Sequence, residues 1–156
     1  MRTLILDDEE PIVKLLARVC QSEGHEVQPF TSSAQALLCL ATEPIDLLIT
    51  DLNMPEHDGL AVIREARRLQ PEIFTLIITG HAAEYPLAEI MMPGTADVMF
   101  KPFHMNELRA RLALAERRRA LIASLEKQRR DLQTASTEMI HGLQNELEYL
   151  RKPAAK

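Results

Sequence analysis

The residues of this chain whose types and positions suit catalytic chemistry are three aspartates, a threonine and a lysine. Asp7 and Asp8 follow one apolar run, Asp51 follows another, and Thr79 and Lys101 end two more. Neighbouring carboxylates raise one another's pKa unless a cation neutralises them. Carboxyl oxygens suit Mg²⁺ or Mn²⁺ and exclude a thiolate zinc site. With a hydroxyl donor and a lysine, the set predicts a phosphoryl site with a carboxylate nucleophile.

A βαβ rhythm would bring these residues to one place. From Met1 to about Phe103, short apolar runs alternate with amphipathic stretches, and Gly and Pro mark the changes. Runs such as Leu47-Leu48-Ile49 favour a parallel sheet covered on both faces. The predicted strands are Thr3–Leu6, Glu26–Phe30, Leu47–Thr50, Ile73–Thr79 and Ala96–Phe100. The fold class is therefore α/β, with a doubly wound, flavodoxin-like, five-stranded sheet, in which ligands bind beyond the carboxyl ends of the strands.

Four helices are predicted between these strands. Ser32 or Ser33 is a candidate N-cap for the second of them, and Gly24 is a candidate stop for the first. The fourth is crowded by Pro86 and Pro93, which leave it little uninterrupted length. The ranges are Pro11–Ser22, Ser33–Thr42, Leu60–Gln70 and Tyr85–Met92.

Over residues 1 to about 115, the ordered set of motifs resembles the receiver domain of two-component response regulators. The matching segments are Ile5-Leu6-Asp7-Asp8-Glu9 with Pro11, Asp51-Leu52-Asn53-Met54-Pro55 with Asp58-Gly59-Leu60, Thr79-Gly80, Gly94, and Lys101-Pro102-Phe103.

The resemblance implies roles for several residues of these motifs. Asp51 would accept a phosphoryl group from a phosphohistidine kinase or phosphotransfer protein. Mg²⁺ or Mn²⁺ would be held by Asp7, Asp8, Asp51 and the backbone carbonyl of Asn53. Thr79 would hydrogen-bond the phosphoryl oxygens and Lys101 would neutralise them, with a cis bond between Lys101 and Pro102.

The chain departs from the receiver pattern in two places. Receivers usually carry an aromatic residue three positions before the lysine, and here that position is Val98. Phe100 shares its face of the strand, so it is a candidate substitute in the switch. The short fourth helix indicates an altered version of the dimer face that is common among receivers.

After Phe103 the sequence predicts one long helix over residues 104–150. Apolar residues recur at near-heptad spacing with one stutter, at Leu121, Leu125, Leu132, Met139, Leu143, Leu147 and Leu150. The predicted organisation is a receiver domain over 1–115, a coiled-coil extension over 116–152 and a tail over 153–156. A domain of about 100 residues cannot cover so many turns, so a parallel homodimer through the coil is favoured over folding back or a different partner.

Charge and composition narrow the function classes. The net charge of −5 divides into −9 over residues 1–103 and +4 over residues 104–156, where the two signs are mixed. An acidic front part and a mixed tail argue against nucleic acid as a partner. No apolar run approaches a bilayer span and no signal pattern begins the chain, which favours a cytoplasmic location without membrane contact. Cys20 and Cys39 are predicted to be reduced, buried thiols.

These patterns predict a phosphorylation switch of a two-component system, whose chemistry acts on its own Asp51 without turning over a metabolite. The alternative is a receiver-plus-coil fragment of a larger hybrid histidine kinase or multidomain response regulator. A haloacid dehalogenase-type phosphatase is a weak alternative, because Glu9 and Asn53 stand where its second aspartate would be. A DNA-binding regulator needs a helix-turn-helix, which an unbroken helix does not supply.

The histidines carry weaker signals. His25, His57 and His104 are expected to be surface or cap residues. His81 lies two residues after Thr79, where receivers vary the rate of aspartyl-phosphate hydrolysis, so a functional and a plain loop position are equally favoured. His141 weakly resembles the phospho-accepting box of sensor kinases, although an exposed helix position is the simpler interpretation.

Overall fold

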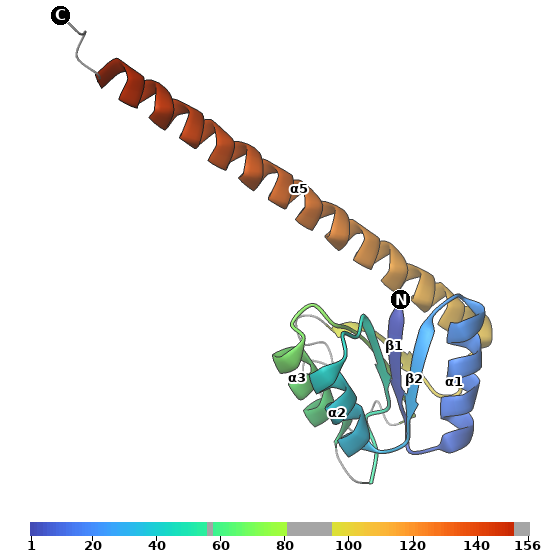
Figure 1. The fold of residues 1–156 in the computed structure, drawn as a ribbon. Helices are drawn as coiled ribbons and strands as arrows, with labels where there is room; N and C mark the ends of the chain where they lie inside the picture. The colour runs from blue at the N-terminus through green and yellow to red at the C-terminus, as the bar shows by residue number, and fades with distance from the viewer. Residues whose placement is uncertain (56–57, 81–94, 152–156) are drawn as a thin grey trace, which may run out of the picture. The chain divides into compact units, whose positions relative to one another are not determined.

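The computed structural model describes residues 1–55, 58–80 and 95–151. Five parallel strands form one sheet in the order β2-β1-β3-β4-β5 (Figure 1). The strands are β1 (Arg2–Leu6), β2 (Glu26–Phe30), β3 (Leu47–Thr50), β4 (Phe74–Thr79) and β5 (Thr95–Phe100). The predicted doubly wound α/β fold is confirmed, and each strand begins within one residue of its predicted start.

The described helices also lie close to their predicted ranges. They are α1 (Glu10–Ser22), α2 (Ser33–Thr42), α3 (Gly59–Leu69) and α5 (Met105–Arg151). Ser32 is the N-cap of α2, and Gly24 follows α1 at φ +83°, a left-handed conformation that suits glycine. The predicted helix over Tyr85–Met92 lies outside the described residues, as do Gly94 and the histidines at 57 and 81.

Helices cover both faces of the sheet, and each face has its own apolar cluster (Figure 1). Along β1, Leu4 and Leu6 belong to the cluster with α2 and α3, whereas Ile5 belongs to the cluster with α1 and the first part of α5. Successive side chains of a strand point to opposite faces, so a strand covered on both sides needs apolar residues at consecutive positions. This explains the unbroken apolar runs in the sequence.

The chain divides into two compact units, residues Met1–Arg117 and residues Arg118–Lys156. We call them the sheet unit and the helix unit. In the helix unit, Ile122 is half-buried and every other side chain of residues 118–148 is exposed. The long helix predicted over 104–150 is observed as α5, while the coiled coil, the boundary at 115/116 and the tail over 153–156 stay predictions.

Two expectations about burial are wrong. Cys20 is buried, but Cys39 is half-buried, although both thiols are free. His25 is not a surface residue: its side chain is buried, with Nδ1 2.8 Å from Thr3 Oγ1 and Nε2 2.9 Å from Glu116 Oε1. The imidazole thus joins the start of the sheet to the part of α5 within the sheet unit. Across the described residues, no helix has the length and apolar character needed to cross a bilayer.

Candidate functional site

The candidate site lies at the carboxyl edge of the sheet, where Asp7, Asp51 and Lys101 directly follow β1, β3 and β5. Backbone hydrogen bonds continue past the strand ends and fix these positions. Asp51 N donates to Leu6 O at 3.2 Å, and Lys101 N donates to Thr79 O at 2.9 Å. Since β1 and β3 are neighbours, the two aspartates emerge side by side. The cis peptide bond expected between Lys101 and Pro102 is confirmed.

The Lys101 ammonium joins the two aspartates. Its Nζ donates to Asp7 Oδ2 at 2.8 Å and to Asp51 Oδ2 at 2.7 Å, and it lies 3.4 Å from Glu9 Oε1. Both aspartates are nearly inaccessible to solvent, with exposures of 1% for Asp7 and 7% for Asp51. Residues that are about 50 and 94 positions apart in the sequence therefore form one ion cluster at the sheet edge.

Backbone amides orient the second oxygen of each carboxylate. Asp51 Oδ1 accepts hydrogen bonds from Leu52 N at 2.6 Å and Asn53 N at 3.2 Å. Asp7 Oδ1 accepts one from Glu9 N at 2.9 Å. Asp51 is thereby held in a single orientation, with Oδ2 directed at the lysine, as a positioned nucleophile requires.

The pKa values of Asp7 and Lys101 are both raised at this edge, for different reasons. Burial raises the pKa of Asp7 and outweighs the lowering effect of its hydrogen bond to Lys101. Burial alone would lower the pKa of Lys101, but its hydrogen bonds to Asp51 and Asp7 outweigh that effect and raise it. The lysine is therefore firmly cationic, whereas burial still destabilises the charged form of Asp7.

The other predicted site residues are placed less closely around the ion cluster. Asp8 is adjacent to Asp7 in the chain, but its side chain is exposed to solvent. Thr79 is fully buried at the end of β4, level with Phe100 of β5. Asn53 contributes its backbone N–H to Asp51. The metal-binding and phosphoryl-binding roles of these residues stay predictions.

The residues at this edge fit a magnesium ion. Within the described ranges, no three His, Cys, Asp or Glu side chains converge into a preformed metal cage. Mg²⁺ does not require one, because it keeps several waters and binds through one or two carboxylates plus phosphate oxygens. Asp7 and Asp51 offer two buried carboxylates with one lysine between them, so a further positive charge would offset the cost that burial imposes on Asp7.

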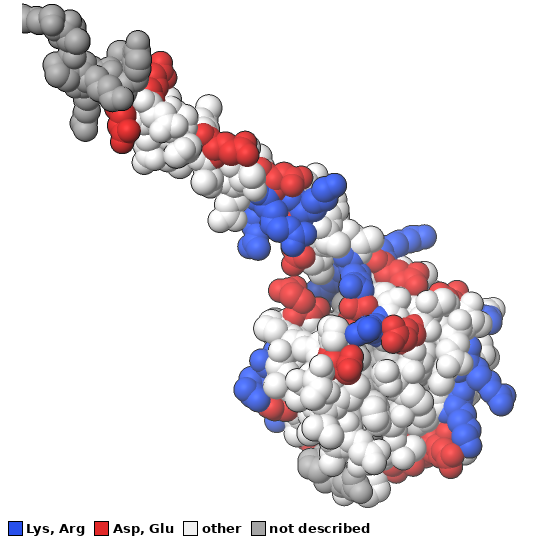
Figure 2. Space-filling view, in the orientation of Figure 1, with Lys and Arg blue, Asp and Glu red and all other residues white. Residues whose placement is uncertain are grey.

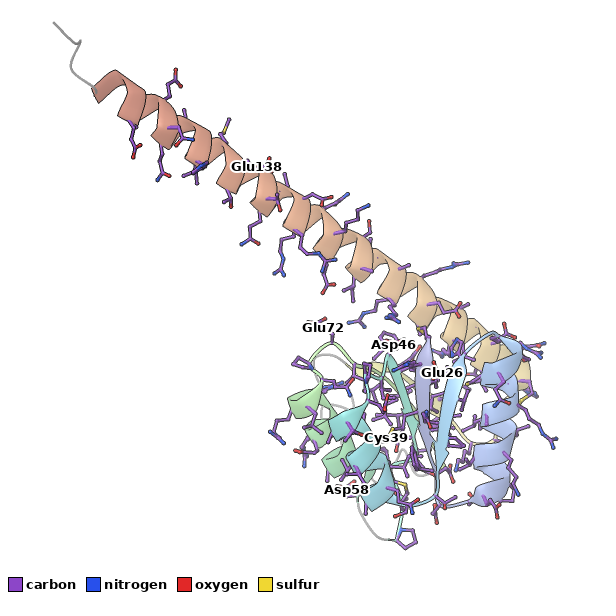
Figure 3. All side chains as sticks on the ribbon, viewed as in Figure 1. Glu26, Cys39, Asp46, Asp58, Glu72 and Glu138 are labelled. Atoms are coloured by element: carbon purple, nitrogen blue, oxygen red, sulfur yellow. The ribbon has the colours of Figure 1, made fainter. Side chains whose placement is uncertain are left out.

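Two residues at the start of α3 had no assigned role at the sequence level, and one of them, Gly59, lies against the backbone of Asp51. Gly59 N donates to Leu52 O at 2.8 Å, and a Cβ at Gly59 would lie 2.1 Å from Asp51 O. Only glycine allows this approach. Asp58 caps α3 by accepting from Leu60 N at 3.0 Å. Figure 3 places Asp58 at the edge where the strands end, opposite Asp46 and Glu26. The Asp-Gly pair before an apolar helix was the available signal.

Comparisons with known proteins agree on one family. Residues 3–113 match the family model described as "Response regulator receiver domain". The chain is 35% identical over 107 residues to the "Response regulator receiver protein CpdR" of Brucella abortus, a match that covers 69% of this chain and 89% of the relative. It is 30% identical to the transcriptional regulatory protein DctD of Rhizobium meliloti, covering 85% of this chain but only 29% of that longer protein.

Solved structures give the same result. A response regulator receiver domain protein from Clostridium thermocellum has a TM-score of 0.70 and 28% identity, over 78% of this chain and 98% of that one. A response regulator from Burkholderia pseudomallei, described with a phosphorylated aspartic acid and a calcium ion, has a TM-score of 0.65 and 26% identity, over 78% of this chain and 72% of that one.

Proposed function

Because the chain belongs to the response regulator receiver domain family, we propose that its sheet unit accepts a phosphoryl group on Asp51 and acts as a phosphorylation-dependent switch. The donor would be a sensor histidine kinase or a phosphotransfer protein. The observation that carries the proposal is the ion cluster, in which Lys101 Nζ lies 2.7 Å from Asp51 Oδ2. That oxygen is oriented by hydrogen bonds and largely shielded from water, which suits a nucleophile toward phosphorus.

In the proposed transfer, Asp51 Oδ2 forms a bond to phosphorus as the bond from phosphorus to the donor's histidine nitrogen breaks. The electron pair of that bond leaves with the imidazole. Lys101 neutralises charge on the transferring group, and Thr79 hydrogen-bonds it afterwards. The amides of Leu52 and Asn53 keep Asp51 Oδ1 fixed throughout.

We propose Mg²⁺, or Mn²⁺ in its place, as the cofactor, because receiver domains generally bind Mg²⁺ at their acidic pocket. Asp7, Asp8, Asp51 and the backbone carbonyl of Asn53 would hold the ion. When bound, it would supply charge neutralisation for the phosphoryl oxygens.

The family usually reads out phosphorylation through an aromatic residue, and Phe100 is the proposed substitute in this chain. Phe100 is level with Thr79 in the register of β4 and β5, and it is 51% exposed. Val98 instead is partly buried against the apolar cluster of α2 and α3, and it carries no aromatic ring. If Thr79 moves toward a phosphoryl group, we therefore expect Phe100 to be the first side chain to change position.

We further propose that the helix unit forms a homodimer through its exposed leucines, in a cytoplasmic protein. A second candidate is the receiver-plus-helix part of a longer regulator. It is favoured by the match to DctD, which extends over 133 residues and so beyond the receiver family model.

Incubation of the full chain with acetyl phosphate and Mg²⁺ tests the proposed function. Intact-mass spectrometry should show one added phosphoryl group, which hydroxylamine removes. Asp51→Asn should abolish this addition, because the amide is not a nucleophile. Asp58→Asn is the matched control, since asparagine caps helices as well as aspartate and leaves the site intact. Labelling that persists in Asp51→Asn would refute the assignment of the phosphoacceptor.

A further inference from the structure

The exposed apolar side chains of the helix unit lie along one stripe, which we call the seam. At 3.6 residues per turn they fall within an arc of about 100° around the helix axis. Each is more than half exposed, from 55% to 73%. The seam consists of Leu121, Leu125, Leu132, Met139, Ile140, Leu143 and Leu147. A stripe of this width and length is typical of a helix that pairs with another helix.

The charges of the helix unit are segregated along its length. Residues 118–130 carry five cations and one acid, whereas residues 131–148 carry four acids and no lysine or arginine. Figure 2 shows the blue side chains gathered toward the first part of the helix unit and red ones beyond them. We call these the basic segment and the acidic segment. The cations are Arg118, Arg119, Lys127, Arg129 and Arg130, and the acids of the acidic segment are Asp131, Glu138, Glu146 and Glu148.

A parallel pair of these helices would bring like charges together. In register, each residue is level with its own copy, so the basic segment would lie along the basic segment. Arg118 makes the conflict sharper because it lies seven residues before Leu125 and fourteen before Leu132, at the same heptad position. The two Arg118 side chains would therefore face each other in the seam itself.

An antiparallel pair removes the conflict within the basic and acidic segments and keeps the seam. When Leu121 is set opposite Leu147 of the second copy, Leu125 falls opposite Leu143 and Arg130 becomes level with Glu138. Each basic segment then lies along an acidic segment. Beyond the two segments the register sets residue 151 level with residue 117, so like charges are level there, outside the paired basic and acidic segments.

We propose that the helix unit binds a second copy of this chain in antiparallel orientation, in the register that sets Leu121 opposite Leu147. This replaces the parallel orientation expected from the apolar spacing alone. It rests on the homodimer of the proposed function and adds its orientation. In such a pair the two Arg118 residues, and the connections to the two sheet units, lie at opposite ends of the paired helices.

A spin label at residue 121 of the full chain measures the orientation directly. The variant is Leu121→Cys with Cys39→Ser, and the chain with Cys39→Ser alone is the labelling control. In the proposed register the two labelled positions are 26 residues apart along the axis, or about 39 Å. In a parallel pair they are separated only by the interaxial distance of about 10 Å. A long distance from pulsed electron resonance supports the proposal, and a short one overturns it.

Charge reversal gives a second test that does not depend on a label. One variant changes Arg118, Arg129 and Arg130 to Glu, a second changes Glu138, Glu146 and Glu148 to Lys, and a third combines all six changes. For an antiparallel dimer, each triple variant should weaken association by about tenfold, and the six-fold variant should restore it. Triple variants that associate as tightly as the wild-type chain would overturn the proposal. In a parallel dimer each changed residue faces its own copy, so the substitution replaces one contact between like charges with another.

Mass measurement by light scattering separates this inference from the function it rests on. A wild-type chain that stays monomeric at all accessible concentrations overturns both the homodimer and its orientation. A dimer with a short distance between the residue 121 labels overturns only the orientation. Phosphorylation of Asp51 by acetyl phosphate is measured on the same samples, and it reports on the switch independently of either outcome.

Discussion

The two parts of α5 carry the same kind of apolar spacing in opposite surroundings. Up to Arg117 the helix packs on the sheet, and Leu108, Leu112 and Ala115 are between 0% and 2% exposed. Beyond Arg117 the apolar residues recur just as regularly, yet Leu132 and Met139 are 73% and 70% exposed. A periodic pattern predicts a helix and its apolar face, but the cover for that face must come from elsewhere in the chain or from a partner.

The comparison also separates two sources of stability. The sheet unit buries its apolar residues in two clusters, one on each face of the sheet, so its folding does not require a second molecule. In the helix unit, by contrast, every described side chain of residues 118–148 is exposed except the half-buried Ile122, so little apolar surface is covered there. Because most helical stability in proteins comes from packing of an apolar face, we expect the helix unit to gain stability if its apolar residues are covered by a partner. The sheet unit should therefore behave as a cooperative domain at any concentration, and the helix unit should not.

Matched leucine substitutions test this contrast with the largest expected effect. Leu112→Ala should lower the free energy of unfolding of the sheet unit by about 2–5 kcal/mol, because it leaves a cavity in the cluster that contains Leu47 and Ile49. Leu132→Ala should leave it unchanged. Urea titration followed by hydrogen exchange of the β3 amides reports on the sheet unit alone. An equal loss in both variants would contradict the division into two units.

Two histidines give a similar pair with a smaller effect. His25→Ala removes both hydrogen bonds of a buried imidazole and leaves the fully buried Thr3 hydroxyl without that partner, at a cost of about 1–3 kcal/mol to the sheet unit. His141→Ala, at an exposed position of the helix unit, should cost nothing measurable there. Thermal unfolding at fixed protein concentration compares them. Equal melting temperatures would show that the link from His25 to Glu116 adds no stability.

The convergence of three candidate site residues at one edge was predictable from the sequence, but their burial was not. Asp7, Asp51 and Lys101 each follow an apolar run, and parallel strands bring their ends to one edge. That logic holds for any α/β sheet and needs no side-chain detail. It does not tell which of two adjacent aspartates is buried: Asp7 is, and Asp8 is exposed. The buried one, Asp7, is also the one that accepts a hydrogen bond from Lys101, 94 residues away in the sequence.

The error at His25 has the same physical origin. Between Gly24 and Glu26, a histidine has the sequence context of an exposed turn. Its burial is set by Thr3 and Glu116, which are 22 and 91 residues away. Local sequence patterns do not predict contacts between residues that are this far apart in the chain. The fold was more accessible to prediction than these details because strands and helices are defined by short-range periodicity, which the whole sheet unit displays.

Two glycines sharpen the comparison with effects of opposite sign. Gly59→Ala should destabilise the sheet unit by about 1–3 kcal/mol, because the new Cβ would lie 2.1 Å from Asp51 O and 2.7 Å from Leu52 Cα. Gly142→Ala meets nothing within 4 Å and should stabilise the helix unit by about 0.5–1 kcal/mol through helix propensity. Unfolding curves and circular dichroism measure the two effects.

The Gly59 variant also carries a functional expectation. Since the displaced peptide is that of Asp51 and Leu52, phosphorylation by acetyl phosphate should slow in Gly59→Ala and stay unchanged in Gly142→Ala. Normal phosphorylation together with lost stability would mean that Gly59 serves the fold without positioning the carboxylate. A phosphorylation rate and a stability equal to those of the wild type would show that the backbone after β3 shifts to accommodate the added methyl group.

The smallest expected effect concerns thiol chemistry. Burial raises the pKa of Cys20 to about 12 from an ordinary value of 9.0, so at pH 8 its thiolate is about a thousandfold scarcer than that of an exposed thiol. A cysteine introduced by Ser124→Cys lies at an exposed position of the helix unit. Iodoacetamide at pH 8, read by mass spectrometry of peptides, should modify that residue first, the half-buried Cys39 more slowly and Cys20 last.

The same shift fixes how Cys20 contributes to stability as a function of pH. Below pH 9 its thiol is protonated in both the folded and the unfolded chain, so its contribution is constant. Between pH 9 and about 12 the unfolded chain releases the proton while the folded chain retains it, and stability falls. Cys20→Ala should remove this part of the alkaline loss. A variant as sensitive to alkali as the wild type would place the responsible groups elsewhere, and fast alkylation of Cys20 at pH 8 would show that the sheet unit opens far more often than its buried core implies.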